Sequence, residues 1–467
     1  MIFLIKINRK TMKFNKTKLF ALAMMVVSAG FIGCSKDDDD DNTGGETPKE
    51  VEVLEGQITT TKILDAKKTY LLKGYVRVMP NGGRLEIPAG TVIKGDKATM
   101  GALIVEKGGY IKANGTPTNP IIFTSNQEAS IRKEGDWAGV VICGNSRVNT
   151  GDGTSTYEGG ALGAGVAVYG GGANPKLDDN SGEFTYVRIE FAGYPILDEK
   201  EINGLTLCGV GSGTKVHHIQ VSYCGDDSFE FFGGTVNASH LIAYRGIDDD
   251  FDFDQGYDGK IQYAISFRDP IMADKSISRA IELDNGGAVS RDEYSRPVLS
   301  NFTMIGPGAT QVTNHGAAVF FGRNSRMVLG NSIVVGARTN AVEFSTDFPA
   351  AELKAGRSVF SNNLVFGTTA NYGLLNVTSF ADVAALTTFV TPLGNTTLAS
   401  VDAAGFNSTA IGSPNLTLKA GSPALGKAKW EGDLANAFFA KETFAGAMGS
   451  TDWTTGWASW TPKTNTY

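Results

Sequence analysis

The stretch FEFFGGTVNASHLIAYRGIDDDFDFD, residues 229–254, contains one full repeat of a pattern that runs through the chain. Its two ends are alternating motifs, FEF at 229–231 and FDF at 251–253, and between them lies a second apolar run, HLIAYRG at 240–246. Alternation with a period of two is typical of a β-strand whose apolar residues point inward and whose middle residue points outward. The stretch therefore predicts short strands joined by tight turns.

Equivalent segments recur on both sides of this stretch. Runs that end in Gly or Asp lie at 187–193, 219–225, 263–269, 301–306, 331–336 and 362–367, and alternating triplets follow at 281–283, 319–321 and 342–344. Successive runs are roughly 20 to 40 residues apart, which is the repeat length of a solenoid with insertions at its corners. Strand-like segments at 83–95, 101–113 and 120–125 extend the pattern toward the N-terminus. We therefore predict an all-β fold, a single-stranded right-handed parallel β-helix over residues 57–429.

The composition predicts many turns and argues against a nucleic-acid ligand. The chain has 467 residues with 58 Gly and 15 Pro, and a formal net charge of −7. Glycine at this frequency without a collagen period indicates many turns between short strands. The acidic balance argues against nucleic acid and against anionic glycans held by bulk charge, and it favours cations or neutral ligands.

Residues 1–33 are predicted to be a secretion signal. Lys13, Lys16 and Lys18 precede an apolar run at 19–33 that is too short to span a membrane comfortably. The end of the run, Phe-Ile-Gly-Cys, resembles the lipobox of bacterial lipoproteins, although a Phe stands where Leu is usual. The resemblance implies cleavage before Cys34 and lipidation of that cysteine.

The acidic run that follows Cys34 points to the cell surface. Its sequence, SKDDDDD at 35–41, resembles the surface-export signal of Bacteroidota lipoproteins. The resemblance implies a lipid anchor in the outer membrane, exposure on the cell surface, and a flexible acidic tether over residues 34–56. The membrane is then a partner through this N-terminal anchor.

Further motifs resemble a family of secreted Bacteroidota proteins with a pectate-lyase-like β-helix. They are GDWAG at 135–139, the Gly-rich insertion at 151–182, GSPA at 421–424 and the tail at 452–467. The resemblance covers nearly the whole mature chain and implies an architecture rather than one reaction. It also implies an internal ladder of stacked asparagines, for which Asn301, Asn331 and Asn362 are the candidates; the alternative is three surface turns. 

Two features concern the ends and the cysteines. Residues 430–467 carry four tryptophans, Trp430, Trp453, Trp457 and Trp460. We interpret them as a C-terminal capping segment, because an open solenoid end exposes a sheet edge; an aromatic platform for sugars is the alternative.

The cysteines at 143, 208 and 224 are interpreted as buried thiols, with a bridge between 208 and 224 as the other option.

An acidic stripe is the candidate site. The outward position of successive triplets holds an acid in several repeats, the position two residues further holds others, and acids also fill the turns before them. The metal-ligand candidates are Glu230, Asp252, Asp254, Glu282, Asp284, Asp226, Asp227, Asp248 and Asp249. Stacked carboxylates repel one another, and Ca²⁺ is the cation that accepts many oxygen ligands with tolerant geometry. A solvated acidic face and a catalytic acid pair remain as alternatives.

The sequence leaves two functions open. One is a non-catalytic binding or scaffold lipoprotein, with a polysaccharide ligand or a TonB-dependent transporter as partner. The other is a Ca²⁺-dependent polysaccharide lyase or a glycoside hydrolase. The motif Gly225-Asp226-Asp227 resembles that of β-helix polygalacturonases, but the nearest His-Gly, at 315–316, lies far downstream and the Arg-x-Lys element is missing. A lyase would need a basic residue beside the acids. Because the acids repeat over several turns, we favour binding.

A transition-metal site is not expected. The chain has four His residues, and His217 and His218 are adjacent, so on a regular strand they would point to opposite faces.

Replacing Cys34 with Ala should abolish lipidation and release the protein from the outer membrane, because the thiol is the only attachment point that the lipobox provides. Metabolic labelling with palmitate measures this directly. Replacing 37–41 with Ala is the matched control for sorting: lipidation should persist while external protease no longer reaches the protein. Persistent labelling of the Cys34 variant would contradict the prediction.

Overall fold

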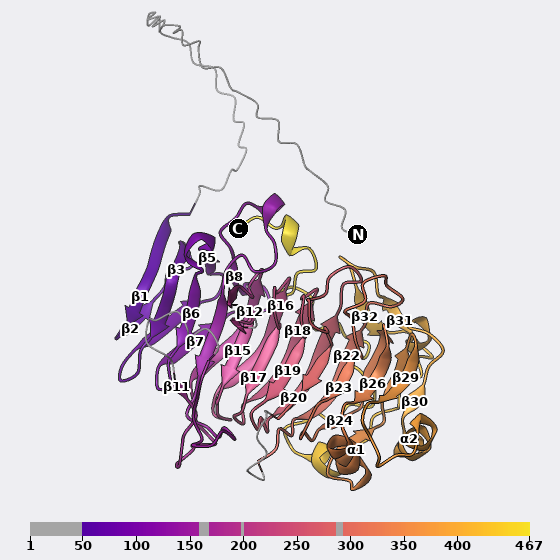
Figure 1. Ribbon diagram of the computed structural model, residues 1–467. Helices are drawn as coiled ribbons and strands as arrows, with labels where there is room; N and C mark the ends of the chain where they lie inside the picture. Colours follow the sequence, from indigo (N-terminus) through magenta and orange to yellow (C-terminus); the bar gives the residue numbers. More distant parts are fainter. Residues whose placement is uncertain (1–48, 158–167, 198–199, 286–292) are drawn as a thin grey trace, which may run out of the picture. The chain divides into compact units, whose positions relative to one another are not determined.

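The predicted β-helix is confirmed. The computed structural model describes residues 49–157, 168–197, 200–285 and 293–467. Cys34 and the acidic run after it lie outside these residues. Most strands belong to one parallel sheet that winds around a central core (Figure 1). Each turn contributes up to three strand segments, so the solenoid has three walls, which we number in the order in which the chain passes through them.

Wall 1 consists of β6 (Ala102–Val105), β9 (Gly139–Cys143), β15 (Leu205–Cys208), β17 (Phe229–Phe232), β19 (Phe251–Asp254), β21 (Ile281–Leu283), β23 (Val319–Phe321), β26 (Asn340–Phe344) and β29 (Ala370–Leu374). Wall 2 contains β2 (Thr61–Ile63), β4 (Arg84–Pro88), β7 (Tyr110–Asn114), β24 (Val328–Gly330) and β27 (Val359–Ser361). Wall 3 contains β5 (Val92–Gly95), β8 (Ile121–Ser125), β25 (Ile333–Ala337), β28 (Leu364–Gly367) and β30 (Thr396–Thr397).

Longer strands bend from one wall to the next. Those that run from wall 2 into wall 3 are β12 (Gly182–Glu190), β16 (Lys215–Ser222), β18 (Asn237–Tyr244), β20 (Lys260–Phe267) and β22 (Val298–Ile305). Those that run from wall 3 into wall 1 are β1 (Val51–Ile58) and β3 (Thr69–Val78). Short antiparallel pairs are β10 (Ser155–Thr156) with β11 (Val168–Tyr169), β13 (Pro195–Leu197) with β14 (Lys200–Glu201), and β31 (Phe406–Ser408) with β32 (Asn415–Leu418). The α-helices of the described chain are α1 (Asp347–Lys354) and α2 (Val383–Val390). None of its helices has the length and apolar character needed to cross a membrane.

The alternating register predicted for wall 1 is confirmed. Phe231, Phe253 and Leu283 are partners in successive parallel pairs, and all three are fully buried. The rings of Phe231 and Phe253 stack with their centroids 5.0 Å apart. Neighbouring turns thus bury identical positions against one another, which is why the apolar residues recur at fixed places in each repeat.

A one-residue corner separates wall 2 from wall 3. The corner residue has a left-handed backbone conformation in seven consecutive turns: Tyr186, His218, His240, Tyr263, Asn301, Asn331 and Asn362. Left-handed backbone turns the chain sharply and interrupts strand alternation. The expectation that the side chains of His217 and His218 point to opposite faces was therefore wrong. Their Nδ1 atoms lie 2.9 Å apart.

The internal polar ladder lies one residue beyond the predicted asparagines. Asn363 Oδ1 accepts the backbone N–H of Ser332 at 2.9 Å, and Asn395 Oδ1 accepts the backbone N–H of Asn363 at 3.0 Å. The side chains of Ser332, Asn363 and Asn395 are buried. Asn301 and Asn331, in contrast, are corner residues that bind the C-terminal part of the chain. The ladder prediction was correct in kind and wrong in position.

The cysteines show no disulfide among the described residues. Cys143, Cys208 and Cys224 are buried thiols in this part of the chain. Cys143 and Cys208 are register partners on adjacent turns of wall 1, where they pack as small apolar side chains. The interpretation as buried thiols is confirmed.

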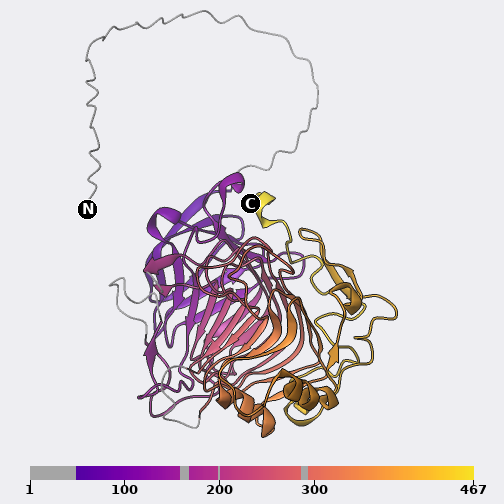
Figure 2. The ribbon, with the colours of Figure 1, turned by 45° about the vertical axis from the view of Figure 1, so that its right-hand side comes forward.

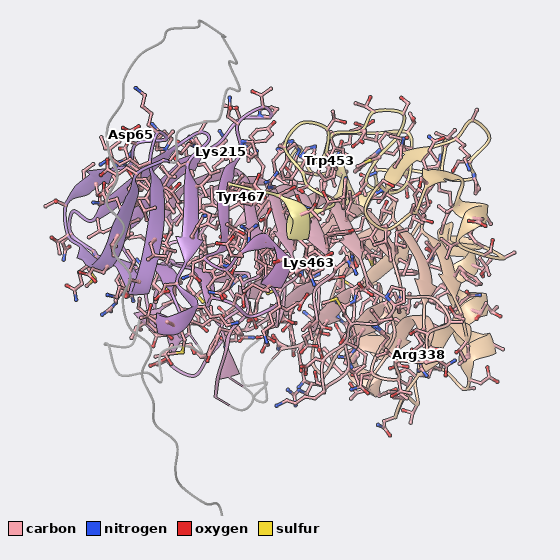
Figure 3. The ribbon with its side chains drawn as sticks, turned by 90° about the horizontal axis from the view of Figure 1, so that it is seen from above. Asp65, Lys215, Arg338, Trp453, Lys463 and Tyr467 are labelled. Atoms are coloured by element: carbon pink, nitrogen blue, oxygen red, sulfur yellow. The ribbon has the colours of Figure 1, made fainter. Side chains whose placement is uncertain are left out.

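The last part of the chain, residues 398–467, which we call the tail, runs back along wall 3. It covers the outward side chains of that wall, among them Ile242, Ile265 and Ile333, with its own apolar residues, which include Met448 and Trp457. Figure 2 shows the tail as a separate layer beside the strands, and Figure 3 places Trp453, Lys463 and Tyr467 along it. From Phe191 to Leu364, wall 3 is therefore buried on both faces.

Side-chain amides on the solenoid clamp the tail backbone. Gln262 donates to Ala440 O and accepts from Ala440 N, both at 2.8 Å. Gln220 does the same with Ser459, at 2.7 and 2.8 Å. A side-chain amide presents a donor and an acceptor side by side, so it pairs with the N–H and C=O of one residue as a neighbouring strand would.

The C-terminal end of the core is covered by α2 rather than by the tail. Leu386 and Val390 of α2 and nearby Phe380 are buried in the main core together with Phe360 and Tyr372 of the last turns. The predicted capping segment, 430–467, instead packs on the side of the solenoid, where Trp453 and Trp457 lie edge-on against the ring of His218.

Gln262→Leu should destabilise the protein by about 1–3 kcal/mol, because the buried side chain of Gln262 loses both of its hydrogen bonds to the backbone of Ala440. Denaturant unfolding measures the loss, and hydrogen exchange should show faster exchange at Ala440. Gln57→Leu, at an exposed position of β1, is the matched control and should change little. Equal stability of the two variants would show that the clamp does not hold the tail.

Candidate metal centre

Three acids of the predicted stripe stack on wall 1. Glu230 pairs in register with Asp252, and Asp252 pairs with Glu282. The column continues through Phe320 to Glu343. Equivalent positions on neighbouring parallel strands are about 4.8 Å apart. The period-two pattern of the sequence therefore brings carboxylates from three turns into one line.

Two loops place further acids beside this column. Asp226 and Asp227 lie in the loop between β16 and β17, and Asp248 lies in the equivalent loop one turn later. Glycine at 225 allows the first loop to approach its neighbour, because an added Cβ would lie 2.6 Å from the carbonyl oxygen of Gly193. The loop acids therefore face the end of the wall 1 column.

The acids form two triads that share Asp227. One carboxylate oxygen each from Asp226, Asp227 and Asp248 lie within 4.8 Å of one another, and the same holds for Asp227, Glu230 and Asp252. Five of the nine predicted ligands thus come together. No other cluster of this kind occurs in the part of the chain that the structure describes.

The other four predicted ligands lie outside the triads. Asp249 accepts a hydrogen bond from the backbone N–H of Arg279, and the Arg279 guanidinium donates to Glu282 at 2.8 Å. Asp284 accepts from Arg323 at 2.8 Å. These acids have cationic or backbone partners. Asp254, the ninth, follows Asp252 by two residues and joins neither triad.

The stripe is less exposed than predicted. The side chain of Glu230 is only 5% exposed, and the amide of Asn203 donates to its Oε2. Asn203 precedes β15, one turn earlier, and nothing in its sequence context marks it as part of the site. The prediction that Glu230 faces solvent was therefore wrong, because the turn before it covers this end of the column.

Burial and mutual repulsion favour protonation of the cluster. Burial, followed by the neighbouring carboxylates, raises the pKa of Asp227, Asp249 and Asp252 well above the usual range. Burial likewise raises the pKa of Asp248 to about 6. A charged group in a poorly hydrated site is costly unless an opposite charge compensates it. The cluster therefore needs protons or a cation.

The arrangement fits a cation that prefers oxygen ligands. Oxygen atoms that each lie about 2.4 Å from one Ca²⁺ are at most about 4.8 Å apart, and the oxygens of each triad lie within 4.8 Å of one another. Asp252, a member of the second triad, has a buried Oδ1 with no hydrogen-bond partner. Cysteine is absent from both triads, and so is histidine, which disfavours zinc and copper.

The basic residues expected of a lyase are paired with acids. Arg268 contacts Asp250 at 3.0 Å in a buried pair, and Arg245 contacts Asp269 at 2.5 Å. Arg279 contacts Glu282, as described above. A guanidinium that neighbours a carboxylate stays charged, so none of the three is set up to take a proton.

His315 does not supply a catalytic base at the surface. Its side chain is 1% exposed and it pairs by a β-bridge with Ser278. Burial lowers its pKa to about 4. The sequence resemblance to the polygalacturonase motif therefore does not extend to a histidine placed beside Asp226 and Asp227 as an exposed acid or base.

The fold places the chain among the parallel β-helix proteins, and comparison with known families identifies which family it belongs to. The chain belongs to the pectate-lyase-like β-helix domain family, whose model matches residues 56–421. No curated protein matches the chain. A similar solved structure is that of the Dettilon tailspike protein, with 15% identity and a TM-score of 0.24. The match covers 56% of this chain and 60% of that chain, so it spans less than two thirds of the tailspike chain.

Asp252→Asn should stabilise the metal-free protein at pH 8 by at least about 1 kcal/mol, because it removes a charge that repels its neighbours. The gain should shrink toward pH 5. The pKa of Asp252 is higher in the folded state than in the unfolded state, so the wild-type protein loses stability as pH rises through the folded pKa. Thermal melting in EDTA at both pH values measures the difference. Glu343→Gln, on the same wall outside the triads, is the control, and a gain independent of pH would contradict the assignment.

Proposed function

We propose that the protein is a non-catalytic binding protein of the bacterial cell surface, anchored through Cys34, in which the two acid triads bind Ca²⁺. The observation that carries the proposal is the shared Asp227 between two triads of converging carboxylate oxygens. Two cation sites that share a ligand would link the loops at Asp226 and Asp248 to wall 1. The bound ions would then order this surface and present open coordination positions to a ligand.

A neutral or acidic polysaccharide is the ligand class that such a surface would accept. Calcium takes six to eight oxygen ligands, and three carboxylates leave positions that hydroxyl or carboxylate oxygens of a sugar can fill. The protein would hold its ligand near the outer membrane, and a TonB-dependent transporter is the partner we propose for uptake. The lipid anchor and the transporter rest on the N-terminal sequence and its resemblance to surface lipoproteins.

The paired arginines favour binding over catalysis. A lyase needs a base beside the acids, whereas Arg245, Arg268 and Arg279 each contact a carboxylate. A hydrolase needs one acid and one base flanking the scissile bond, whereas the raised pKa values here belong to a crowded group of acids. The Ca²⁺-dependent lyase remains the alternative that the experiments below test.

Calcium should raise the melting temperature of the full chain in detergent, because a ligand of the folded state stabilises it by mass action, about 2.7 kcal/mol at a hundredfold excess over Kd. Asp227→Asn removes the ligand common to both triads and should weaken calcium binding at least tenfold in a calorimetric titration. Asp402→Asn, an exposed acid in the tail, is the matched control. Absence of binding heat together with unchanged melting in EDTA would contradict the metal sites.

A glycan array probed with and without Ca²⁺ tests the ligand. Binding that requires Ca²⁺ and is lost in Asp227→Asn is the expected result. Release of unsaturated, ultraviolet-absorbing products from a uronic-acid polymer would instead establish the lyase.

A further inference from the structure

A groove of about 550 Å³ lies beside the corners of the solenoid at Asn362 and Gly394, away from the triads and independent of the proposed function. The solenoid contributes Val359, Asn362 and Leu393 to its lining, and the tail contributes Lys429, Glu431 and Leu434. Its volume is within the range of ligand sites in proteins. No aromatic side chain lines it, so a sugar ring would find no face to stack on.

The groove contains the last asparagine of the corner column, and Gly394 (φ 83°) takes the corner position on the next turn. Asn301, Asn331 and Asn362 occupy equivalent left-handed positions on successive turns, with φ values of 57°, 54° and 57°. Their flanking strand segments pair in register. The three side chains therefore leave the backbone in the same direction, about 4.8 Å apart along the solenoid.

Two of these asparagines bind polypeptide backbone. Asn331 donates to Lys429 O at 3.0 Å and accepts from Lys429 N at 2.9 Å. Asn301 donates to Phe444 O at 3.0 Å and to Gly446 O at 3.2 Å. The amide of Asn362 has no hydrogen-bond partner among the described residues, and it lines the groove instead. The column of corner asparagines thus continues for one turn beyond the last one whose side chain binds tail backbone.

We propose that this groove binds an extended peptide segment of another protein, whose main-chain N–H and C=O pair with the amide of Asn362 as Lys429 pairs with Asn331. The occupant is a peptide because the same amide in the same column already binds main-chain groups on the two preceding turns. An apolar side chain of the peptide lies between Val359 and Leu393, which is 37% exposed. The exposed Glu431 favours a basic neighbour in the peptide.

A phage-displayed library of random linear heptapeptides, selected on the full chain in detergent, tests this proposal. Enriched peptides, synthesised with a fluorescein label, should bind in anisotropy titrations. Asn362→Gly should weaken binding at least tenfold, because glycine keeps the left-handed backbone and removes the amide. Asn324→Gly, at another left-handed asparagine outside the groove (φ 58°), should bind as the wild type does.

A second variant, Ser361→Trp, fills the groove without removing Asn362 and should also abolish binding. Melting curves of all variants show whether the fold is kept. Failure to enrich any peptide over the Asn362→Gly protein would overturn the proposal. So would peptides that bind both asparagine variants equally. Oligosaccharides on a glycan array whose binding depends on Asn362 would make the groove a sugar site and overturn the proposal as well.

Discussion

Parallel pairing between successive turns is the constraint from which the other features follow. Each residue of one turn lies about 4.8 Å from its equivalent in the next. Every side chain therefore packs beside the side chain at the equivalent position of the neighbouring turn. For apolar residues this is favourable, and the rings of Phe231 and Phe253 stack inside wall 1. For acids it is unfavourable, and Glu230, Asp252 and Glu282 are held in line by the same pairing. The core and the candidate site thus have one cause.

The chain resolves this repulsion in two ways along the same wall. Toward the C-terminal turns, Glu282 and Asp284 have arginine partners from their own or the next turn. Around Asp227, burial and the neighbouring carboxylates raise the pKa values of Asp227 and Asp252. This difference is the reason why the triads, rather than the whole stripe, are proposed as the cation site.

The parts of the structure that depend on periodicity could be predicted from sequence. Alternation in FEF and FDF defines which residues are inside, and their equivalence defines the column of acids. Departures from periodicity could not be predicted. The left-handed backbone at His218 and its equivalents interrupts the alternation of inward and outward side chains. The corner residue Asn362 therefore does not join the ladder, which includes the next residue, Asn363. The adjacent Asn362-Asn363 pair was a signal that both positions were available.

Contacts between segments that are distant in the sequence could not be predicted either. Asn203 covers Glu230, and the tail covers wall 3, yet neither shows a pattern that marks its partner. The near-continuous apolar runs of wall 3, such as that around Leu241–Tyr244, did carry a hint. A strand that is buried on both faces is apolar at successive positions rather than at alternate ones, and something had to cover its outer face.

The tail has a consequence for how the solenoid unfolds. In a solenoid each repeat touches only its neighbours, so stability is a sum of local terms and turns can fray one at a time. Here the tail is joined to Asn331 at one end and to Arg188 and Glu190, through Tyr467, at the other. The turns between these points cannot open while the tail stays bound. A linear array of weakly coupled units thereby becomes a single cooperative one over its middle section. The tail also contacts Lys94 and Arg132 in earlier turns, so the strands before Lys94 are the ones expected to open first.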